Sequence, residues 1–131
     1  MADYTVKRID DMEGIYRGSF KRARAELGVD SFGMQIMDLP PEMGDRYPEH
    51  DHAEDGQEEV YVVLRGSGEI EIEGEKIAID PETLVRVASG TMRRVRTHDE
   101  GMRLLVIGGV PGGAYEPPDI SKLGEPDPMA G

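Results

Sequence analysis

Two histidines and one glutamate are the residues of this chain best suited to hold a metal ion. His50 and His52 are two positions apart, so both imidazoles project from the same face of an extended strand. Glu59 opens an apolar run, residues 60–64, that is typical of a buried strand. Imidazole and carboxylate groups are ligands for Fe, Mn, Zn, Ni and Co. The pattern therefore predicts a three-ligand divalent metal site on neighbouring strands, with coordination positions left open.

The spacing of these residues resembles the first motif of the cupin superfamily. That motif reads Gly-x5-His-x-His … Glu-x6-Gly, and it is matched by Gly44, His50, His52, Glu59 and Gly66. The gap between His52 and Glu59 is longer than is usual in the family, which predicts a longer turn over residues 53–57, since extra loop length costs little free energy. By this resemblance the chain is identified as a single-domain bacterial-type cupin.

The family's second motif is degenerate in this chain. It reads Gly-x5-Pro-x-Gly-x2-His-x3-Asn, and its His is the family's fourth metal ligand. When the motif is aligned on Gly90, its other four positions hold Glu82, Ala88, Arg93 and Thr97. Arg93 therefore stands where the resemblance places a ligating His, and a permanently charged guanidinium cannot ligate a metal.

The sequence leaves two interpretations of Arg93 open. In the first, His50, His52 and Glu59 hold a metal, and Arg93 turns aside or pairs with a carboxylate or carbonyl group of a substrate. In the second, Arg93 forms an ion pair with Glu59 and the metal is lost, because a guanidinium close to a divalent cation is repelled unless an anion lies between them. Tyr61 and Tyr47 join Arg93 as candidates for the ligand pocket, by packing rather than by acid–base chemistry.

Short antiparallel strands are the elements that must position these residues. Six segments either alternate apolar and polar residues or form apolar stretches, and Gly, Pro and Asp turns separate them. They are residues 31–39, 69–73, 76–79, 83–88, 93–97 and 102–107. This pattern predicts an all-β fold, an antiparallel sandwich or barrel, and the resemblance implies the double-stranded β-helix, or jelly roll. Arg94 and Arg96 should face away from Arg93, and His98 should lie on the surface.

The two ends of the chain look different from this barrel. Residues 5–9 are compatible with a short strand, and residues 11–27 carry apolar side chains near helical spacing, although Gly14 and Gly18 weaken a helix there. The C-terminal end is rich in Pro and Gly, which is typical of disorder, but some apolar residues could dock it on the barrel or on a second subunit. One domain is expected, with an N-terminal helical and strand extension, a cupin barrel and a C-terminal tail at residues 1–30, 31–110 and 111–131.

Composition restricts the classes of partner and location. The net charge of −12 argues against nucleic acid and anionic membrane surfaces as partners, since both are polyanions. The absence of cysteine excludes disulfides and thiolate metal sites. No apolar run reaches membrane-spanning length and the N-terminus lacks a signal-peptide core, so we expect a cytoplasmic protein.

The resemblance implies a small-molecule-binding protein with one divalent metal ion, Fe, Mn, Ni or Zn, in the barrel, and Arg93 favours an anionic ligand. Two other hypotheses stay open. One is a metal-dependent dioxygenase or isomerase acting on a small carboxylate or carbonyl compound, and the other is a metal-free structural or regulatory dimer. A homodimer is expected because dimers are the commonest closed oligomers.

Overall fold

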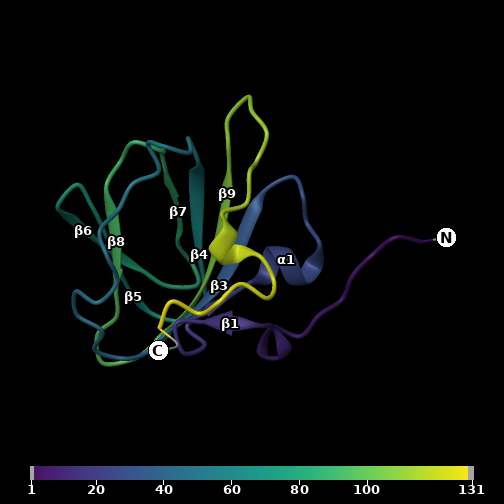
Figure 1. The fold of residues 1–131 in the computed structure, drawn as a ribbon. Coiled ribbons are helices and arrows are strands. Elements are labelled where there is room, and N and C mark those ends of the chain that lie inside the picture. Colours follow the sequence, from purple (N-terminus) through teal and green to yellow (C-terminus); the bar gives the residue numbers. More distant parts are fainter. Residues whose placement is uncertain (1, 130–131) are drawn as a thin grey trace.

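Two antiparallel β-sheets packed face to face form the body of the protein in this computed structural model, which describes residues 2–129 (Figure 1). The large sheet has the strand order β1 (Gly14–Ile15), β2 (Phe20–Lys21), β3 (Gly33–Leu39), β9 (Met102–Gly109), β4 (Glu58–Gly66) and β7 (Leu84–Val87). The small sheet has the order β6 (Glu75–Ile79), β5 (Gly68–Ile72) and β8 (Arg93–Arg96). This all-β arrangement is the jelly roll that the sequence predicts.

Alternating apolar residues on the inner faces of both sheets form the core. Ile70 and Val95 of the small sheet and Leu104 of the large sheet have no exposed surface, and Tyr61 is 1% exposed. On β9 each buried residue alternates with a half-buried one, as a strand with one face against the core requires. Full burial of an apolar side chain contributes about 1.5–3 kcal/mol, so these residues hold the two sheets together.

The outer face of the small sheet carries a network of charges. Arg96 contacts the Glu71 carboxylate at 2.6 Å and the Asp45 carboxylate at 2.8 Å. His98 lies on the surface, as predicted, with its Nε2 2.8 Å from the Glu69 carboxylate. Arg94 also faces outward and pairs with Asp45. These contacts hold His98 and both arginines away from the interior of the jelly roll.

The helix expected over residues 11–27 is wrong for most of that range. The structure has a 3-10 turn η1 (Ile9–Asp11), the hairpin β1–β2 and a short helix α1 (Ala23–Leu27), which ends at Gly28 with φ 78°. The hairpin turn places Tyr16, Arg17 and Gly18 at positive φ, a backbone conformation that no α-helix contains. The strand expected over residues 5–9 is also absent from the residues that the structure describes, where this segment pairs with no strand.

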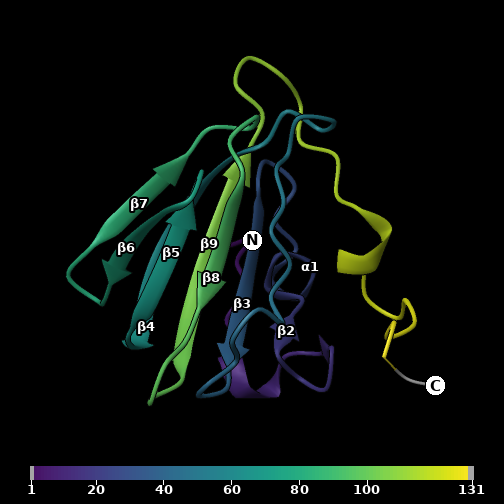
Figure 2. The ribbon, with the colours of Figure 1, turned by 90° about the vertical axis from the view of Figure 1, so that its left-hand side faces the viewer.

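The C-terminal tail docks on the body of the protein rather than leaving it. Figures 1 and 2 show the chain after β9 turning back along the molecule, with the 3-10 turn η2 (Asp119–Ser121), toward the β1–β2 region. The ring of Tyr115 packs so closely on Gly33 of β3 that a Cβ there would lie 2.8 Å from it. Leu123 does not take part, since it is 50% exposed. Across residues 2–129 we find no helix with the length and apolar character that crossing a bilayer requires.

Candidate metal site

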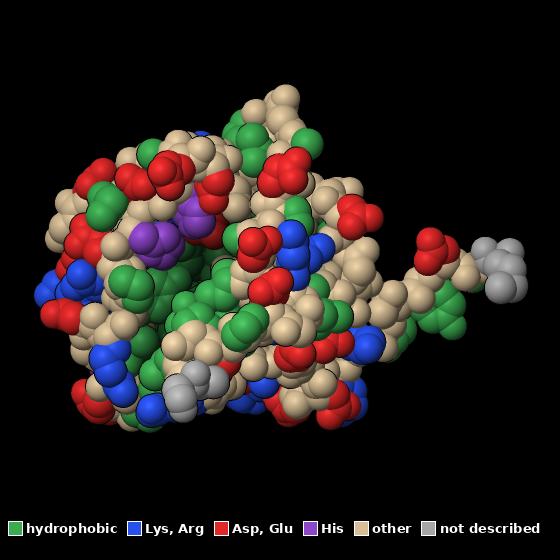
Figure 3. Space-filling view, viewed as in Figure 1, with side chains coloured by type: hydrophobic (Ala, Val, Ile, Leu, Met, Phe, Trp, Pro, Cys, Tyr) green, Lys and Arg blue, Asp and Glu red, His purple; other side chains and the backbone are tan. Residues whose placement is uncertain are grey.

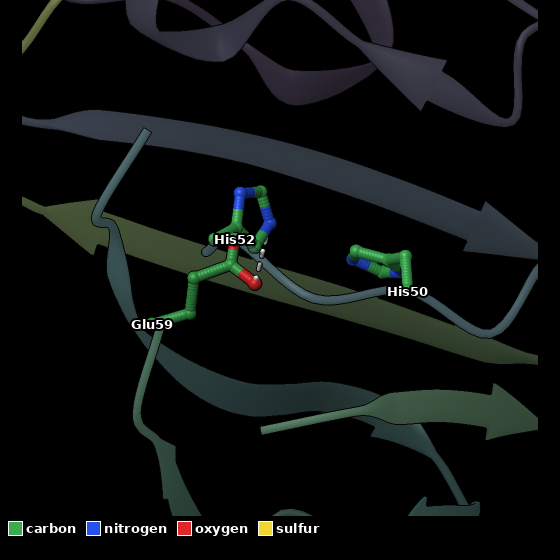
Figure 4. Close-up of side chains that lie close together, drawn as sticks. All are labelled: His50, His52 and Glu59. Atoms are coloured by element: carbon green, nitrogen blue, oxygen red, sulfur yellow. Dashed lines mark ion pairs between the residues drawn. The ribbon is translucent and has the colours of Figure 1, made fainter. Parts of the chain in front are cut away.

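His50 and His52 lie on the loop that joins β3 to β4, and Glu59 lies near the start of β4 (Figure 4). Two backbone hydrogen bonds, of 3.0 and 2.9 Å, join His50 to Arg93 in an isolated antiparallel bridge. The amide of His52 donates to the carbonyl of Ser89 at 2.7 Å. These bonds hold the loop as an extended segment beside β8, so the two imidazoles project the same way from alternate positions.

The three side chains converge. One nitrogen from each histidine and one carboxylate oxygen of Glu59 lie within 4.8 Å of one another. Nε2 of His52 is 3.3 Å from Oε1 of Glu59, the contact marked in Figure 4. Ligands that share one metal at about 2.0–2.2 Å are themselves roughly 3–4 Å apart, so only small side-chain movements are needed to close the site around an ion. This cluster can hold a metal ion.

The second nitrogen of each imidazole has its own partner. Nδ1 of His50 is 3.1 Å from the carbonyl oxygen of Pro48, and Nδ1 of His52 is 3.1 Å from the carboxylate of Asp55. A ring Nδ1–H that donates to a carbonyl or carboxylate leaves Nε2 with its lone pair available for a metal. Asp55 is in turn held by the backbone amide of Gln57 at 3.0 Å. The donor set and its supporting contacts therefore fit a divalent metal.

The surroundings of Glu59 favour its ionised form. Burial acts to raise the pKa of Glu59, but the hydrogen bond and charge of His52, the hydrogen bond from Tyr61 and the charge of Arg93 outweigh it and lower that pKa. The hydrogen bond to Glu59 raises the pKa of His52 above its ordinary value, and burial opposes this. Glu59 is thus the ionised carboxylate that a metal requires, whereas binding of a metal at His52 must displace any proton held there.

Arg93 lies behind Glu59, away from the cavity. Its side chain has no exposed surface, and Nη2 is 3.6 Å from Oε1 of Glu59. Nη1 donates to the carbonyl of Thr91 at 2.9 Å, while Nε has no hydrogen-bond partner within residues 2–129. The structure therefore combines the three-ligand cluster of the first interpretation with the Arg93–Glu59 ion pair of the second.

The two tyrosines occupy different places. Tyr61 is buried and donates a 2.9 Å hydrogen bond to Oε1 of Glu59, and burial raises its pKa so that the phenol stays neutral. It orients Glu59 and does not line the cavity. Tyr47 does line the cavity, where its ring lies 5.8 Å from that of His50 and burial raises its pKa. Of the three residues expected in the pocket, Tyr47 faces it and Arg93 and Tyr61 stand behind it.

A cavity of about 1160 Å³ adjoins the metal cluster. Figure 3 shows it as a hollow with hydrophobic side chains inside and histidines at its rim. All three cluster residues line it, together with the apolar side chains of Phe20, Leu39, Met37, Met43, Tyr47, Tyr115 and Ile120. Such a cavity is large enough for a small organic molecule.

Sequence reasoning missed several lining residues. Asp55 has a signal that the sequence does contain, because a carboxylate three residues after a candidate ligand can reach its imidazole across a turn. Phe20, Tyr115 and Ile120 offer no such signal, because they come from the two ends of the chain and reach the cavity only through the tertiary fold.

Comparison with known proteins agrees with this geometry. Residues 35–108 match the family profile of the cupin domain, Cupin_2. A cupin protein from Bacteroides fragilis is similar in structure, with 24% identity, a TM-score of 0.69, and 92% of this chain and 95% of that chain covered. A sugar phosphate isomerase of the cupin superfamily from Silicibacter pomeroyi has 16% identity, a TM-score of 0.63, and coverage of 80% and 75%.

A protein from Photorhabdus luminescens is also similar, with 17% identity, a TM-score of 0.61, and 94% and 93% of the two chains covered. No curated protein matches the sequence. At these identities the similar structures establish the shared fold, and what each of them binds or converts does not transfer with it.

Proposed function

The chain belongs to the cupin domain family, and from this premise we propose that it binds one divalent metal ion through His50, His52 and Glu59, and a small organic molecule in the cavity beside them. The convergence of these three side chains supports the proposal most strongly. Nδ1 of each histidine has a partner outside the cluster, and Nε2 of His52 faces Glu59. Contacts of this kind fix the orientation of imidazoles that bind a metal.

Each contact around the cluster has a role in this function. The carbonyl of Pro48 and the carboxylate of Asp55 fix the two imidazole rings, and Tyr61 fixes the Glu59 carboxylate. Arg93 opposes the metal electrostatically but is partly neutralised by Glu59, which lies between its guanidinium and the histidines. A bound Fe, Mn, Ni or Zn ion would supply a Lewis-acid centre for an oxygen atom of the small molecule.

A metal-dependent dioxygenase or isomerase, acting on a small carboxylate or carbonyl compound, is the second candidate. The observation that favours it is that all three cluster residues line the cavity, so a cluster of three ligands leaves coordination positions facing a bound molecule. Turnover of such compounds by metal-loaded protein, lost in His52→Ala, tests this candidate. Binding of a ligand without turnover across a carboxylate and carbonyl panel contradicts it.

Metal content and titration calorimetry test the primary proposal. Protein purified without a histidine tag should carry one metal per chain or bind Mn²⁺, Ni²⁺ or Zn²⁺ at a stoichiometry of one. His52→Ala should abolish that binding, and His98→Ala should keep it, because His98 contacts Glu69 on the outer face of the small sheet. Absence of any metal binding after supplementation would reject the proposal and favour a metal-free structural or regulatory protein, in which the Arg93–Glu59 pair replaces the ion.

We also propose that two copies pair in solution through the outer face of the large sheet. Leu64 and Leu84 are 41% and 71% exposed on that face, and the extended N-terminal segment carries Tyr4 and Val6, which are 78% and 81% exposed. Figure 1 shows this segment projecting from the body on the α1 side. Light scattering should give a dimer mass that Leu84→Glu reduces to that of a monomer, and a monomeric wild type at micromolar concentration would refute the pairing.

A further inference from the structure

One wall of the cavity is built by residues outside the family match. Residues 16–20 of the β1–β2 hairpin line it, and so do tail residues, namely Tyr115, Pro118, Ile120 and Met129. Figure 3 shows histidines at one end of the hollow, basic side chains at the opposite rim and hydrophobic side chains between them. The basic residues that line the cavity are Arg17 and Arg46.

Arg17 sits on a turn that L-amino acids rarely adopt. The amide of Gly18 donates to the carbonyl of Ile15 at 3.1 Å and closes the turn, with φ 53° at Tyr16 and 60° at Arg17. Glycine or asparagine normally fills both central positions of such a turn, because a side chain there crowds the backbone. Something outside the turn must therefore stabilise it.

Asp127 of the tail provides that stabilisation. Its carboxylate accepts the amide N–H of Tyr16 at 2.9 Å and that of Arg17 at 3.4 Å. Two backbone donors that converge on one carboxylate fix the orientation of the peptide groups between them. The position of the Arg17 Cα, and hence the direction of its side chain, depends on where the tail holds Asp127.

Arg22 anchors the tail. Its side chain is 1% exposed, and its Nη1 contacts the Glu13 carboxylate at 2.6 Å. Nε donates to the carbonyl of Ile120 at 2.8 Å, and Nη2 donates to the carbonyl of Glu125 at 2.7 Å. One buried guanidinium thus ties the residues on either side of Leu123 to the N-terminal region and places Asp127 against the turn.

Among the arginines in and near the cavity, Arg17 is the candidate to bind an anion when contacts within residues 2–129 are considered. Arg46 donates to the carbonyls of Met43 and Glu42 at 3.0 and 3.4 Å. Arg93 is buried behind Glu59 and does not reach the cavity. The guanidinium of Arg17 makes no hydrogen bond or ion pair with any of the described residues, although its planar group can bind a carboxylate or sulfonate through two parallel hydrogen bonds.

We propose that Arg17 binds the anionic end of an organic acid with an apolar body, and that Asp127 is the positioning residue that aims Arg17 at it. The apolar side chains between the two ends of the cavity, such as Phe20 and Met37, contact the body of that ligand. This inference rests on the proposed function for the metal at the far end of the cavity, where an oxygen atom of the same ligand would meet the ion.

Two dyes with the same aromatic body test the inference. The probes are 1-anilinonaphthalene-8-sulfonate and N-phenyl-1-naphthylamine, which differ only in the sulfonate, and their fluorescence rises on binding in an apolar cavity. Wild type should bind the sulfonate more tightly than the neutral dye. Arg17→Gln should weaken sulfonate binding about tenfold and leave the neutral dye unchanged, and Arg17→Lys should restore part of the loss.

Matched variants isolate the roles. Arg8→Gln removes the same charge from an exposed residue that does not line the cavity, so this variant should keep wild-type binding of both dyes. Asp127→Ala should reduce the preference for the sulfonate, whereas Asp127→Asn, which keeps an acceptor oxygen, should retain most of it.

The outcomes separate this inference from the proposed function. The role of Arg17 would be overturned if Arg17→Gln lowered the affinity for both dyes equally, or lowered it for neither. It would also be overturned if the wild type bound metal but neither dye. A calorimetric titration of Zn²⁺ into Arg17→Gln should match wild type, because Arg17 is not in the metal cluster. Wild type without metal binding, but with sulfonate preference lost in Arg17→Gln, would overturn the metal proposal and support the anion site.

Discussion

The two ends of the cavity are positioned by different kinds of contact. At the metal end, His50 and His52 lie on a loop bonded to the adjacent strand and turn, and Glu59 lies on β4, which is paired on both sides with β9 and β7. At the other end, Arg17 lies on a turn that is held by Asp127, 110 positions later in the chain. The first end is built by strand pairing inside the family fold, and the second by side chains from the two termini.

This difference indicates which properties should vary independently. Backbone hydrogen bonds position the metal cluster independently of the tail. The opposite wall depends on the buried Arg22 and on the carboxylate of Asp127 in the tail. A substitution at the tail end should therefore leave metal affinity unchanged, and a substitution at the metal end should leave binding of the sulfonate dye unchanged. Variants at each end can test that independence.

Loss of the Arg22 anchor should have the largest effect. Arg22→Met leaves two tail carbonyls and the partly exposed Glu13 carboxylate without their donor, and we expect the free energy of unfolding to fall by about 3 kcal/mol, since an acceptor left unpaired costs about 1–3 kcal/mol. Amide hydrogen exchange of residues 111–129 should become faster. Zn²⁺ affinity should stay at the wild-type value, and a parallel loss of metal binding would show that the two ends are coupled.

Removal of the Glu59 charge should have an effect of similar size. Glu59→Gln deprives the buried Arg93 of its counter-charge, so the metal-free protein should lose about 3 kcal/mol of unfolding free energy in urea denaturation. Glu58→Gln removes a carboxylate from the exposed pair with Arg86 and should cost much less. If the two variants lose the same stability, the Arg93–Glu59 pair is not the buried interaction that the structure shows.

Asp55→Ala should weaken metal binding without abolishing it. The variant removes the acceptor of His52 Nδ1, and loss of the partner that orients a metal-binding imidazole typically costs about 10- to 100-fold in metal affinity. Calorimetry with Zn²⁺ measures the change, with Glu54→Ala as a nearby exposed control. Unchanged affinity would mean that Asp55 does not orient the imidazole.

Arg93→His should have the smallest of these effects on the cluster, and in the opposite direction. It removes a positive charge near the ion and supplies an imidazole from the position where the family places a fourth ligand, so metal affinity should rise by up to about tenfold. Binding of the sulfonate dye should not change, because Arg93 does not reach the cavity. Unchanged metal affinity would show that this side chain does not influence the cluster.

Much of the fold and the metal end could be predicted from the sequence. Strict alternation on residues 69–73 predicts which side chains enter the core, the apolar run at residues 102–107 predicts a core strand, and the spacing of His50, His52 and Glu59 places them together. The turn over residues 53–56 also agrees with the longer gap before Glu59. Local pattern sufficed here because strand pairing follows from periodicity.

The other end could not be predicted, for physical reasons. The apolar residues Met12 and Ile15 have near-helical spacing, yet both are buried, and Ile15 belongs to strand β1 of a hairpin whose turn Asp127 stabilises from the tail. The composition of the tail is typical of disorder, because nothing local reveals that Arg22 binds its carbonyl groups. Long-range hydrogen bonds override the helical propensity of this segment, and the placement of Arg17 in the cavity depends on those bonds.

X-ray absorption spectroscopy of the Zn²⁺-loaded protein, prepared without a histidine tag, shows which atoms bind the ion. We expect two imidazole ligands with Zn–N distances of about 2.0–2.1 Å and oxygen ligands for the remaining positions. His98→Ala should leave the imidazole scattering unchanged, and His50→Ala should reduce it to that of a single ring. A zinc shell of oxygen atoms alone, or one that keeps both imidazoles in His50→Ala, would contradict a metal site formed by His50, His52 and Glu59.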